Sequence, residues 1–330
     1  MKKSILLAAA AFAVSLTAAH ADWKPEKPIT VIVPYPAGGV TDLVVRVVAE
    51  DLSPVLGQKV VVVNQAGANG SVGTRAVMDS TRDGYTWLSG GARDIGTYGV
   101  MGMLETGLHD WHPFLAASIG SILSVNPNTG IDSVEGFVSA VKEQGDDFLI
   151  ATAGPNSSGG TALGAIAQVA GIDPEQLVFD GGNPAILSTV SGETQATTQL
   201  SLEQAEMIRA GRLNPLAAIG RTSITLGDTV IPPISDTFPD LPPTENFVGI
   251  YLPEGTPQEV VDALAAVWAD VLSNSEKLAE LCGTRGCGVA PMAPEAAFEA
   301  ADPLIAAAAW GLFDRGEAAV SPDTLGIDRP

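Results

Sequence analysis

Two glycine-containing turns carry the residues best suited to bind a ligand. The first, residues 34–39, reads Pro-Tyr-Pro-Ala-Gly-Gly and joins an apolar run at 29–33 to a helical pattern that begins at Val40. The second, residues 180–185, reads Asp-Gly-Gly-Asn-Pro-Ala and follows a short apolar run at 177–179. The first amides of a helix have no partner within the helix and lie at the positive end of its dipole, so they bind anions. Each turn is therefore a candidate anion site, with an ordinary strand-to-helix connection as the alternative.

Two charged residues close to the predicted turns are open to two interpretations each. Asp42 lies in the first turn of the predicted helix, where it can stabilise the positive helix end and pair with Arg46. Alternatively, it orders water or a ligand amine. Arg93 follows a predicted strand at 85–89 and can hold a carboxylate with its guanidinium, or it can pair with Asp94.

Residues typical of catalysis are scarce. His109 and His112 have the spacing of a metal pair, but a surface turn is the preferred interpretation. The chain has no G-x-S-x-G turn, because Asn69 stands where the first glycine would be, and it has no Walker A lysine. We therefore expect no catalytic residues, no metal and no cofactor. A periplasmic hydrolase remains the alternative among enzymes.

Strand and helix patterns alternate in both halves of the chain. In the first half, apolar runs at 29–33, 59–64 and 85–89 precede glycine turns or helical patterns, and runs at 148–152 and 177–179 repeat this in the second half. Such alternation predicts parallel strands with helical crossovers, and ligands then bind beyond the carboxyl ends of the strands. Two halves whose turns face one another would enclose a cleft.

Other segments complete the predicted organisation. The proline-dense stretch 231–244 reads as a linker that crosses back between domains. Apolar periodicity predicts helices at 257–273, 275–282 and 294–316. Cys282 and Cys287 are the only cysteines, and an oxidising compartment favours a disulfide that closes a short turn. A metal pair would need two further ligands nearby.

The amino terminus has the features of a secretory signal. Lys2 and Lys3 precede an apolar stretch at 5–16 and the motif Ala19-His-Ala21, which predicts a signal peptide over residues 1–21 that is cleaved after Ala21. No later uncharged apolar run has the roughly 18 residues of a spanning helix, so we expect a soluble product. In a Gram-negative cell this places the protein in the periplasm. The remaining 309 residues are long for one core and predict two domains.

The charge of the chain excludes one class of partner. Without the signal peptide, 15 basic residues stand against 38 acidic ones. There is no basic stripe that could release counterions from DNA or RNA, so nucleic-acid binding is excluded. An acidic surface repels anions at long range, but salt screens this effect beyond roughly 8–10 Å. A cluster of amides can still hold a carboxylate at contact distance.

Motifs along nearly the whole mature chain resemble one family. The chain closely resembles the substrate-binding proteins of tripartite tricarboxylate transporters, the Bug or TctC family, in Val33-Pro-Tyr-Pro-Ala-Gly-Gly-Val-Thr-Asp42, Leu56-Gly-Gln-Lys-Val60, Asp83-Gly-Tyr-Thr86, Asp180-Gly-Gly-Asn-Pro-Ala185, Ala210-Gly-Arg-Leu213, Pro239-Asp-Leu-Pro-Pro-Thr-Glu245 and Pro253-Glu-Gly-Thr-Pro257. The resemblance implies an α/β, two-domain periplasmic-binding-protein fold (type II), with a mostly parallel mixed sheet flanked by helices in each domain and a ligand cleft between the domains. We expect residues 22–125 plus 247–330 to form domain 1 and residues 126–246 to form domain 2.

The resemblance also implies a ligand and partners. A small organic carboxylate is expected between the domains, and the closed protein is expected to deliver it, as a monomer, to integral membrane transporter subunits. The runner-up among binding proteins is an extracytoplasmic sensor that feeds a signalling kinase. The expected ligand-binding residues, combined from the family motifs and from the two turns, are Tyr35, Ala37, Gly38, Gly39, Thr41, Asp42, Arg93, Ser157, Asp180, Gly181, Gly182, Asn183, Pro184 and Ala185.

The chain departs from the family pattern at three places. The second turn often begins with Tyr and Lys in the family, where this chain has Phe179 and Asp180. A histidine common on the helix after Ser157 corresponds to Gly160, and a Gly-x-Val-Asp motif corresponds to Gly192-Glu-Thr-Gln195. An acid in place of the lysine is less favourable for a second carboxylate, and it suits an amine, a hydroxyl or an aromatic acid.

Overall fold

The structure is a computed structural model that describes residues 23–330. In it the β-branched run at 29–33 forms a strand, β1 (Ile29–Val33), which belongs to a six-stranded sheet. The expected signal peptide lies outside the described residues. β1 pairs in parallel with β2 and β3, and the antiparallel pairs are β12 with β3, β12 with β4 and β13 with β4. The sheet order is β13-β4-β12-β3-β1-β2, and the strands after β1 are β2 (Val60–Asn64), β3 (Thr86–Gly91), β4 (Trp111–Ile119), β12 (Asn246–Pro253) and β13 (Cys287–Met292).

Helices cover both faces of this sheet. One face packs on α1 and α8, with Val44, Leu52, Leu264 and Trp268 in one apolar cluster with β1. The other face packs on α3 and α10. We call this sheet and its helices the first lobe; the helices are α1 (Val40–Leu56), α2 (Ser71–Met78), α3 (Ala92–Thr97), α8 (Gln258–Ser273), α9 (Glu276–Arg285) and α10 (Pro294–Asp314).

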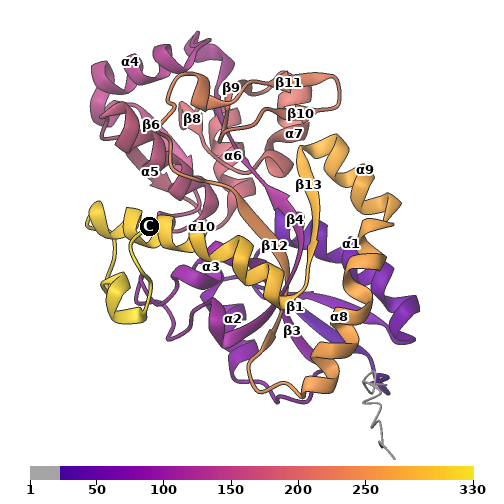
Figure 1. Cartoon of the computed structure of the whole chain (residues 1–330). Helices are drawn as coiled ribbons and strands as arrows, with labels where there is room; N and C mark the ends of the chain where they lie inside the picture. The colour runs from indigo at the N-terminus through magenta and orange to yellow at the C-terminus, as the bar shows by residue number, and fades with distance from the viewer. Residues whose placement is uncertain (1–22) are drawn as a thin grey trace, which may run out of the picture.

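A five-stranded sheet forms the second lobe, which lies above the first in Figure 1. β6 pairs in parallel with β7 and β8, and β5 pairs antiparallel with β8 and β9. The strands, in the order β7-β6-β8-β5-β9, are β5 (Ser121–Val125), β6 (Leu149–Thr152), β7 (Glu175–Val178), β8 (Ala196–Thr197) and β9 (Asn214–Ile219). Its helices are α4 (Val134–Gln144), α5 (Ser158–Ala170), α6 (Gly182–Ser191) and α7 (Ser201–Arg209), and a separate hairpin consists of β10 (Ile224–Leu226) and β11 (Thr229–Ile231).

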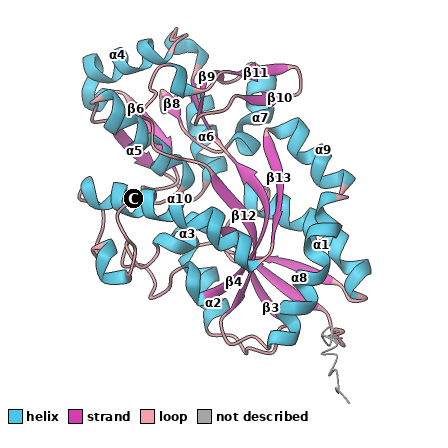
Figure 2. Cartoon of the chain, viewed as in Figure 1, coloured by secondary structure: helices cyan, strands magenta, loops and turns pink. Residues whose placement is uncertain are grey.

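The predicted α/β fold with two mixed sheets and flanking helices is therefore confirmed (Figure 2). The sheets contain more antiparallel pairing than the sequence pattern indicates. β4, β13 and the β10–β11 hairpin were not predicted. β4 contains Pro113, which argues against a strand in sequence, and its first residues follow His109 in the segment interpreted as a surface turn.

The chain crosses between the lobes twice, and only the return crossing lies close to the predicted linker. β4 ends at Ile119 in the first sheet and β5 begins at Ser121 in the second. The return crossing follows the proline-dense stretch and ends at β12, which begins at Asn246. By sheet membership the first crossing falls at Gly120, five residues before the expected boundary at 125, and we propose these two crossings as the domain boundaries.

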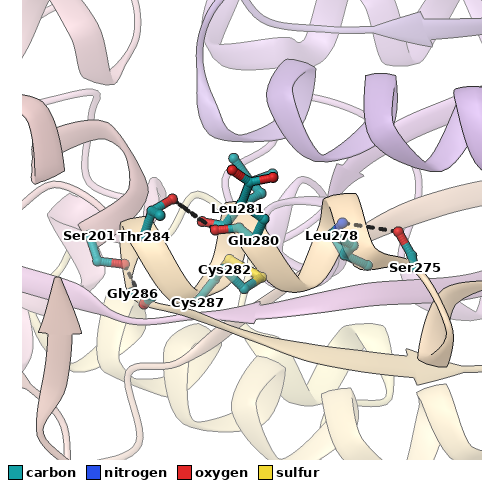
Figure 3. The surroundings of a disulfide bond; sticks show 9 residues. All are labelled: Ser201, Ser275, Leu278, Glu280, Leu281, Cys282, Thr284, Gly286 and Cys287. Carbon is teal, nitrogen blue, oxygen red and sulfur yellow. Dashed lines mark hydrogen bonds between the residues drawn. A yellow bond between two sulfur atoms is a disulfide. The ribbon is translucent and has the colours of Figure 1, made fainter. Parts of the chain in front are cut away.

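Two further contacts join the lobes beside the crossings. On one side α9 packs on α7, and Arg285 contacts both Glu206 (3.1 Å) and the carbonyl oxygen of Leu202 (3.3 Å). The Cys282–Cys287 disulfide closes the turn after α9, and Ser201 Oγ donates a hydrogen bond to the Gly286 carbonyl oxygen (2.9 Å; Figure 3). The predicted disulfide is thus present, next to the start of α7.

On the other side α10 packs on α5. Gly164 of α5 faces the Arg315 guanidinium so closely that a Cβ atom at Gly164 would lie 2.5 Å from Arg315 Cζ. α10 is also the one helix of residues 23–330 that is long and apolar enough, by length and composition, to cross a membrane. It packs against α3, β4 and α5, and one third of its apolar window is buried there.

Candidate ligand-binding site

The first glycine turn lies between β1 and α1, as predicted. Gly38 has a φ of 83°, a conformation that favours glycine, and Gly39 precedes the first helical residue, Val40. No side chain of the turn caps the helix. The first amides of α1 are therefore directed at the space beyond the turn.

Asp42 has a structural role in this turn. Its carboxylate accepts hydrogen bonds from Arg46 (2.7 and 3.0 Å), from the Asn64 side chain (2.9 Å) and from the Gly38 amide (2.9 Å). Burial acts to raise the pKa of Asp42, but these hydrogen bonds outweigh burial and lower the pKa below its usual value. The predicted pairing with Arg46 is confirmed, and Asp42 does not line the cavity described below.

The second glycine turn meets the first across the lobes. A Cβ atom at Gly181 would lie 3.6 Å from Pro36, and one at Gly38 would lie 3.8 Å from the Asn183 side chain. Gly181 has a φ of 112° and directly precedes α6. The amino-terminal ends of α1 and α6 therefore approach the same space from opposite lobes.

The space between the amino-terminal ends of α1 and α6 contains a cavity of about 60 Å³. Eight of the predicted site residues line it, namely Tyr35, Gly39, Thr41, Ser157, Gly181, Gly182, Asn183 and Pro184. Six do not, namely Ala37, Gly38, Asp42, Arg93, Asp180 and Ala185. Ala37, Gly38 and Asp180 are exposed to solvent, and Ala185 is on the buried face of α6. Asp180 thus lies on the solvent side of the turn, and the hypothesis that it sets the chemistry of the cleft stays a prediction.

Arg93 is buried behind the site and does not enter it. Only 1% of its surface is exposed, and Nη1 donates to the carbonyl oxygen of Thr244 (2.9 Å), at the return crossing. Burial lowers the pKa of Arg93 to about 10, against the opposing effect of Asp94 and Glu245. Nε and Nη2 have no hydrogen-bond partner within the described part of the chain. Arg93 thus fixes the linker to α3 and points away from the cavity that its neighbour Asp94 lines.

Asp94 lines the cavity although only its neighbour was predicted to do so. It accepts hydrogen bonds from the Tyr35 hydroxyl (3.0 Å) and the Asn246 side chain (3.4 Å). Burial raises the pKa of Asp94 to about 6, against the effect of Arg93. Its place directly after Arg93 was visible in the sequence, but which of the two side chains turns toward the cleft was not.

Glu203 is a second acidic residue of the cavity that the sequence analysis missed. It lies in the first turn of α7, and its Oε1 accepts a long hydrogen bond from the Val40 amide (3.5 Å). A Cβ atom at Gly182 would overlap Glu203 Oε2, and one at Gly39 would lie 3.6 Å from Oε1. The carboxyl group of Glu203 therefore lies between the amino-terminal ends of α1 and α6. Burial raises its pKa to about 7, against the hydrogen bond from Val40 and with a further rise from Asp94.

Polar groups from both lobes complete the lining. Ser157 caps α5, since its Oγ accepts from the Gly160 amide (3.1 Å). Gly160 packs so tightly on the Gly154 carbonyl that a Cβ atom would overlap it, so no histidine side chain fits there without movement of the backbone. Asn69 has a φ of 51° and donates to the Asn156 side chain of the other lobe. Strained residues of this kind are frequent at binding sites.

Two other features lie away from the turns. A larger cavity of about 1160 Å³ is lined by α10, the segment 99–110 and the chain end 325–330, and it contains none of the predicted site residues.

His109 and His112 pair with different carboxylates, Asp302 and Glu254 (both 3.2 Å). Within residues 23–330 no group of three or more acidic, histidine or cysteine side chains is arranged to hold a metal.

Two lobes that close on a cavity at opposed helix ends define a solute-binding receptor. A family model described as the tripartite tricarboxylate transporter family receptor (TctC) matches residues 44–296. The chain belongs to this family, and the predicted resemblance is confirmed.

Relatives and solved structures agree with this assignment. The chain is 30% identical to a UPF0065 protein of Bordetella bronchiseptica over 80% of this chain and 78% of that protein. It is 28% identical to protein BugT of Bordetella pertussis over 78% and 79% of the two chains. A TctC solute-binding protein from Polaromonas has a TM-score of 0.66 at 27% identity, covering 88% of this chain and 99% of that one. R. palustris Rpa4515, solved with adipate, has a TM-score of 0.78 at 22% identity over 89% and 99%.

Proposed function

We propose that this protein captures a small organic carboxylate between its two lobes and delivers it to the membrane subunits of a tripartite tricarboxylate-type transporter. The observation that carries the proposal is the meeting of two helix amino termini, at Val40 and Gly182, on one cavity; neither is capped by the side chain of its own N-cap residue. Amides at both ends supply hydrogen bonds and positive potential without a basic side chain. The adipate bound in Rpa4515 supports this ligand class.

The protein acts without catalysis in this proposal. A micromolar affinity corresponds to about −8 kcal/mol. Three or four charge-assisted hydrogen bonds, each of roughly 1.5–3 kcal/mol, supply that once the cost of association is subtracted. Hinge closure about the two crossings excludes water and presents the closed form to the transporter. We further propose that residues 1–21 direct the chain to the periplasm and that the mature protein acts as a monomer.

The test is a thermal-shift screen against mono-, di- and tricarboxylates, aromatic acids and amino acids, with the neutral amide of each acid as a control. A ligand at 100 times its dissociation constant stabilises the native state by roughly 2.7 kcal/mol. We expect a shift with one class of acid that is lost with its amide. Equal shifts with the amides, or no shift with any acid, would contradict the proposal.

A substitution at Gly39 tests the position of the site. Gly39 has an ordinary φ of −75°, and a Cβ atom would meet no atom closer than 3.5 Å, so the backbone tolerates a side chain there. Gly39→Leu should fill the cavity and weaken ligand binding at least a hundredfold while the fold is retained. Gly283→Leu, at an exposed position of α9 with open space around it, is the matched control. If Gly39→Leu binds ligand with unchanged affinity, the cavity is not the ligand-binding site.

A further inference from the structure

The position between the two helix ends already holds an acid. Glu203 Oε1 lies 3.5 Å from the Val40 amide, and its Oε2 lies against Gly182 at the start of α6. A bound anion would be attracted to these same amides. A ligand that brings only a carboxylate therefore competes with Glu203 and is repelled by it.

No basic side chain in the cavity balances this acid. Among the described residues, the lining contains Glu203 and Asp94 but no Lys, Arg or His. Arg46 lies outside the lining and holds Asp42, and Arg93, whose charge acts on Asp94, also lies outside the lining, with Nη1 on the Thr244 carbonyl. Two acids at low solvent exposure favour a ligand that carries a positive charge as well as a negative one.

Two atoms in the lining lack partners and are of opposite kind. Glu203 Oε2 is an acceptor, and Gln199 Nε2 is a donor; both are buried, and neither has a hydrogen-bond partner within residues 23–330. The Gln199 side chain is 3% exposed and lines the same cavity. Buried polar groups without partners are costly, so their presence at one cavity indicates a ligand that supplies both a donor and an acceptor.

We infer that the ligand is a small zwitterion, a carboxylate with a neighbouring ammonium group, and that Glu203 binds the ammonium. The ligand carboxylate then accepts hydrogen bonds from Gln199 Nε2 and from amides at the starts of α1 and α6. Asp94 adds negative potential on the side of Tyr35. The inference rests on the proposed function and narrows its ligand class.

The experiment compares matched pairs of ligands by isothermal titration calorimetry. Alanine is compared with propionate, and aspartate with succinate, so that each pair differs by one amino group. We expect wild-type protein to bind the amino member of a pair at least tenfold more tightly. Glu203→Gln should lose at least tenfold for the amino member and bind the plain acid more tightly than wild-type does. Glu193→Gln, an exposed acid of the second lobe, is the control for loss of one negative charge.

The pH dependence of the ligand affinity distinguishes a Glu203 that binds an ammonium group from a Glu203 that only repels a carboxylate. The other titratable groups that line the cavity are Asp94 and Tyr35. On the elements packed against α7, Arg285 of α9 pairs with Glu206 outside the cavity, and α6, β5 and β10 contribute no acidic or basic side chain. An ammonium group requires ionised Glu203, so affinity for the amino acid should rise between pH 6 and pH 8. Affinity for a plain carboxylate should fall over the same range.

The outcomes separate this inference from the proposed function. If propionate or succinate binds wild-type protein as tightly as its amino partner does, the zwitterion inference is overturned and the carboxylate receptor stands. If none of the four ligands binds while their neutral amides do, both the zwitterion inference and the carboxylate-receptor proposal are overturned. The comparison of the paired ligands on wild-type protein is sufficient to test the zwitterion inference, even if Glu203→Gln folds poorly.

Discussion

Glu203 and Asp94 keep their protons at a higher pH in the folded protein than in the unfolded chain. Burial raises the pKa of Glu203 from 4.5 to about 7 and that of Asp94 from 3.8 to about 6. Between these values the unfolded chain is ionised while the native protein retains protons, so a rise in pH favours unfolding. The stability from both groups is fully present below about pH 4 and is lost as the pH rises through 7.

We therefore predict that the free energy of unfolding of the unliganded protein falls from pH 5 to pH 8. Glu203 alone should account for about 1–3 kcal/mol of this change. Urea denaturation at several pH values measures it. Glu203→Gln should flatten the profile and Glu193→Gln should keep the wild-type slope, whereas a flat wild-type profile would show that Glu203 is ionised without penalty.

At the scale of elements, the disulfide-closed turn after α9 supports α7. Ser201, the first residue of α7, donates to Gly286 within that turn, and Arg285 holds Glu206 and the Leu202 carbonyl. The turn thus fixes the start of the helix whose first turn presents Glu203 to the cavity.

Removal of this disulfide should weaken both stability and binding. A closed loop of six residues, from Cys282 to Cys287, contributes about 2 kcal/mol by restricting the unfolded chain. We predict that a Cys282→Ala/Cys287→Ala variant loses this amount in urea denaturation and binds ligand several-fold more weakly. Dithiothreitol should do the same to wild-type protein and nothing to the variant. A variant with full stability would show that α9 fixes α7 without the covalent bond.

Periodicity and turn chemistry predicted most of the elements around the site. The β1–α1 and β7–α6 units follow from an apolar run, a glycine turn and a helical pattern. Elements stabilised by distant pairing were missed. β13 is a short segment that begins at the second cysteine of the disulfide, and it is a strand because β4 lies beside it.

The site itself was only half visible in the sequence. Backbone groups at glycine turns leave a local signal, so the two turns were found. The Glu203 side chain reaches the cavity through the packing of α7 on α6 and β5, and Gln199 reaches it from the segment before α7. No local pattern records either placement. An acidic residue in a first helical turn is ordinarily a surface residue, and its sequence neighbours do not indicate burial.

At the scale of the whole molecule, hydrogen bonds across the cleft hold the lobes together. Asn69 of the first lobe donates to Asn156 of the second, and Asn246 donates to Ser158 (2.9 Å). Because these bonds exist only when the lobes are in contact, each shifts the balance toward the closed form.

We predict that Asn156→Ala opens the unliganded protein and weakens ligand binding about five- to tenfold, in line with the loss of roughly 1 kcal/mol of closed-state stabilisation. Small-angle X-ray scattering should give a larger radius of gyration for the variant without ligand and the wild-type value at saturation. Asn274→Ala, at the exposed end of α8, is the control. Identical scattering and affinity would show that the pair does not determine closure.

Because Gly164 lies so close to Arg315, a substitution at Gly164 would shift the balance between the open and the closed form of the receptor. A side chain at Gly164 that is too large for the Arg315 guanidinium to accommodate by moving aside would act as a wedge between α5 and the end of α10. Such a wedge would hold the receptor open without altering a single group that touches the ligand. Capture of the solute and its hand-over to the membrane could then be studied as separate steps in the living cell.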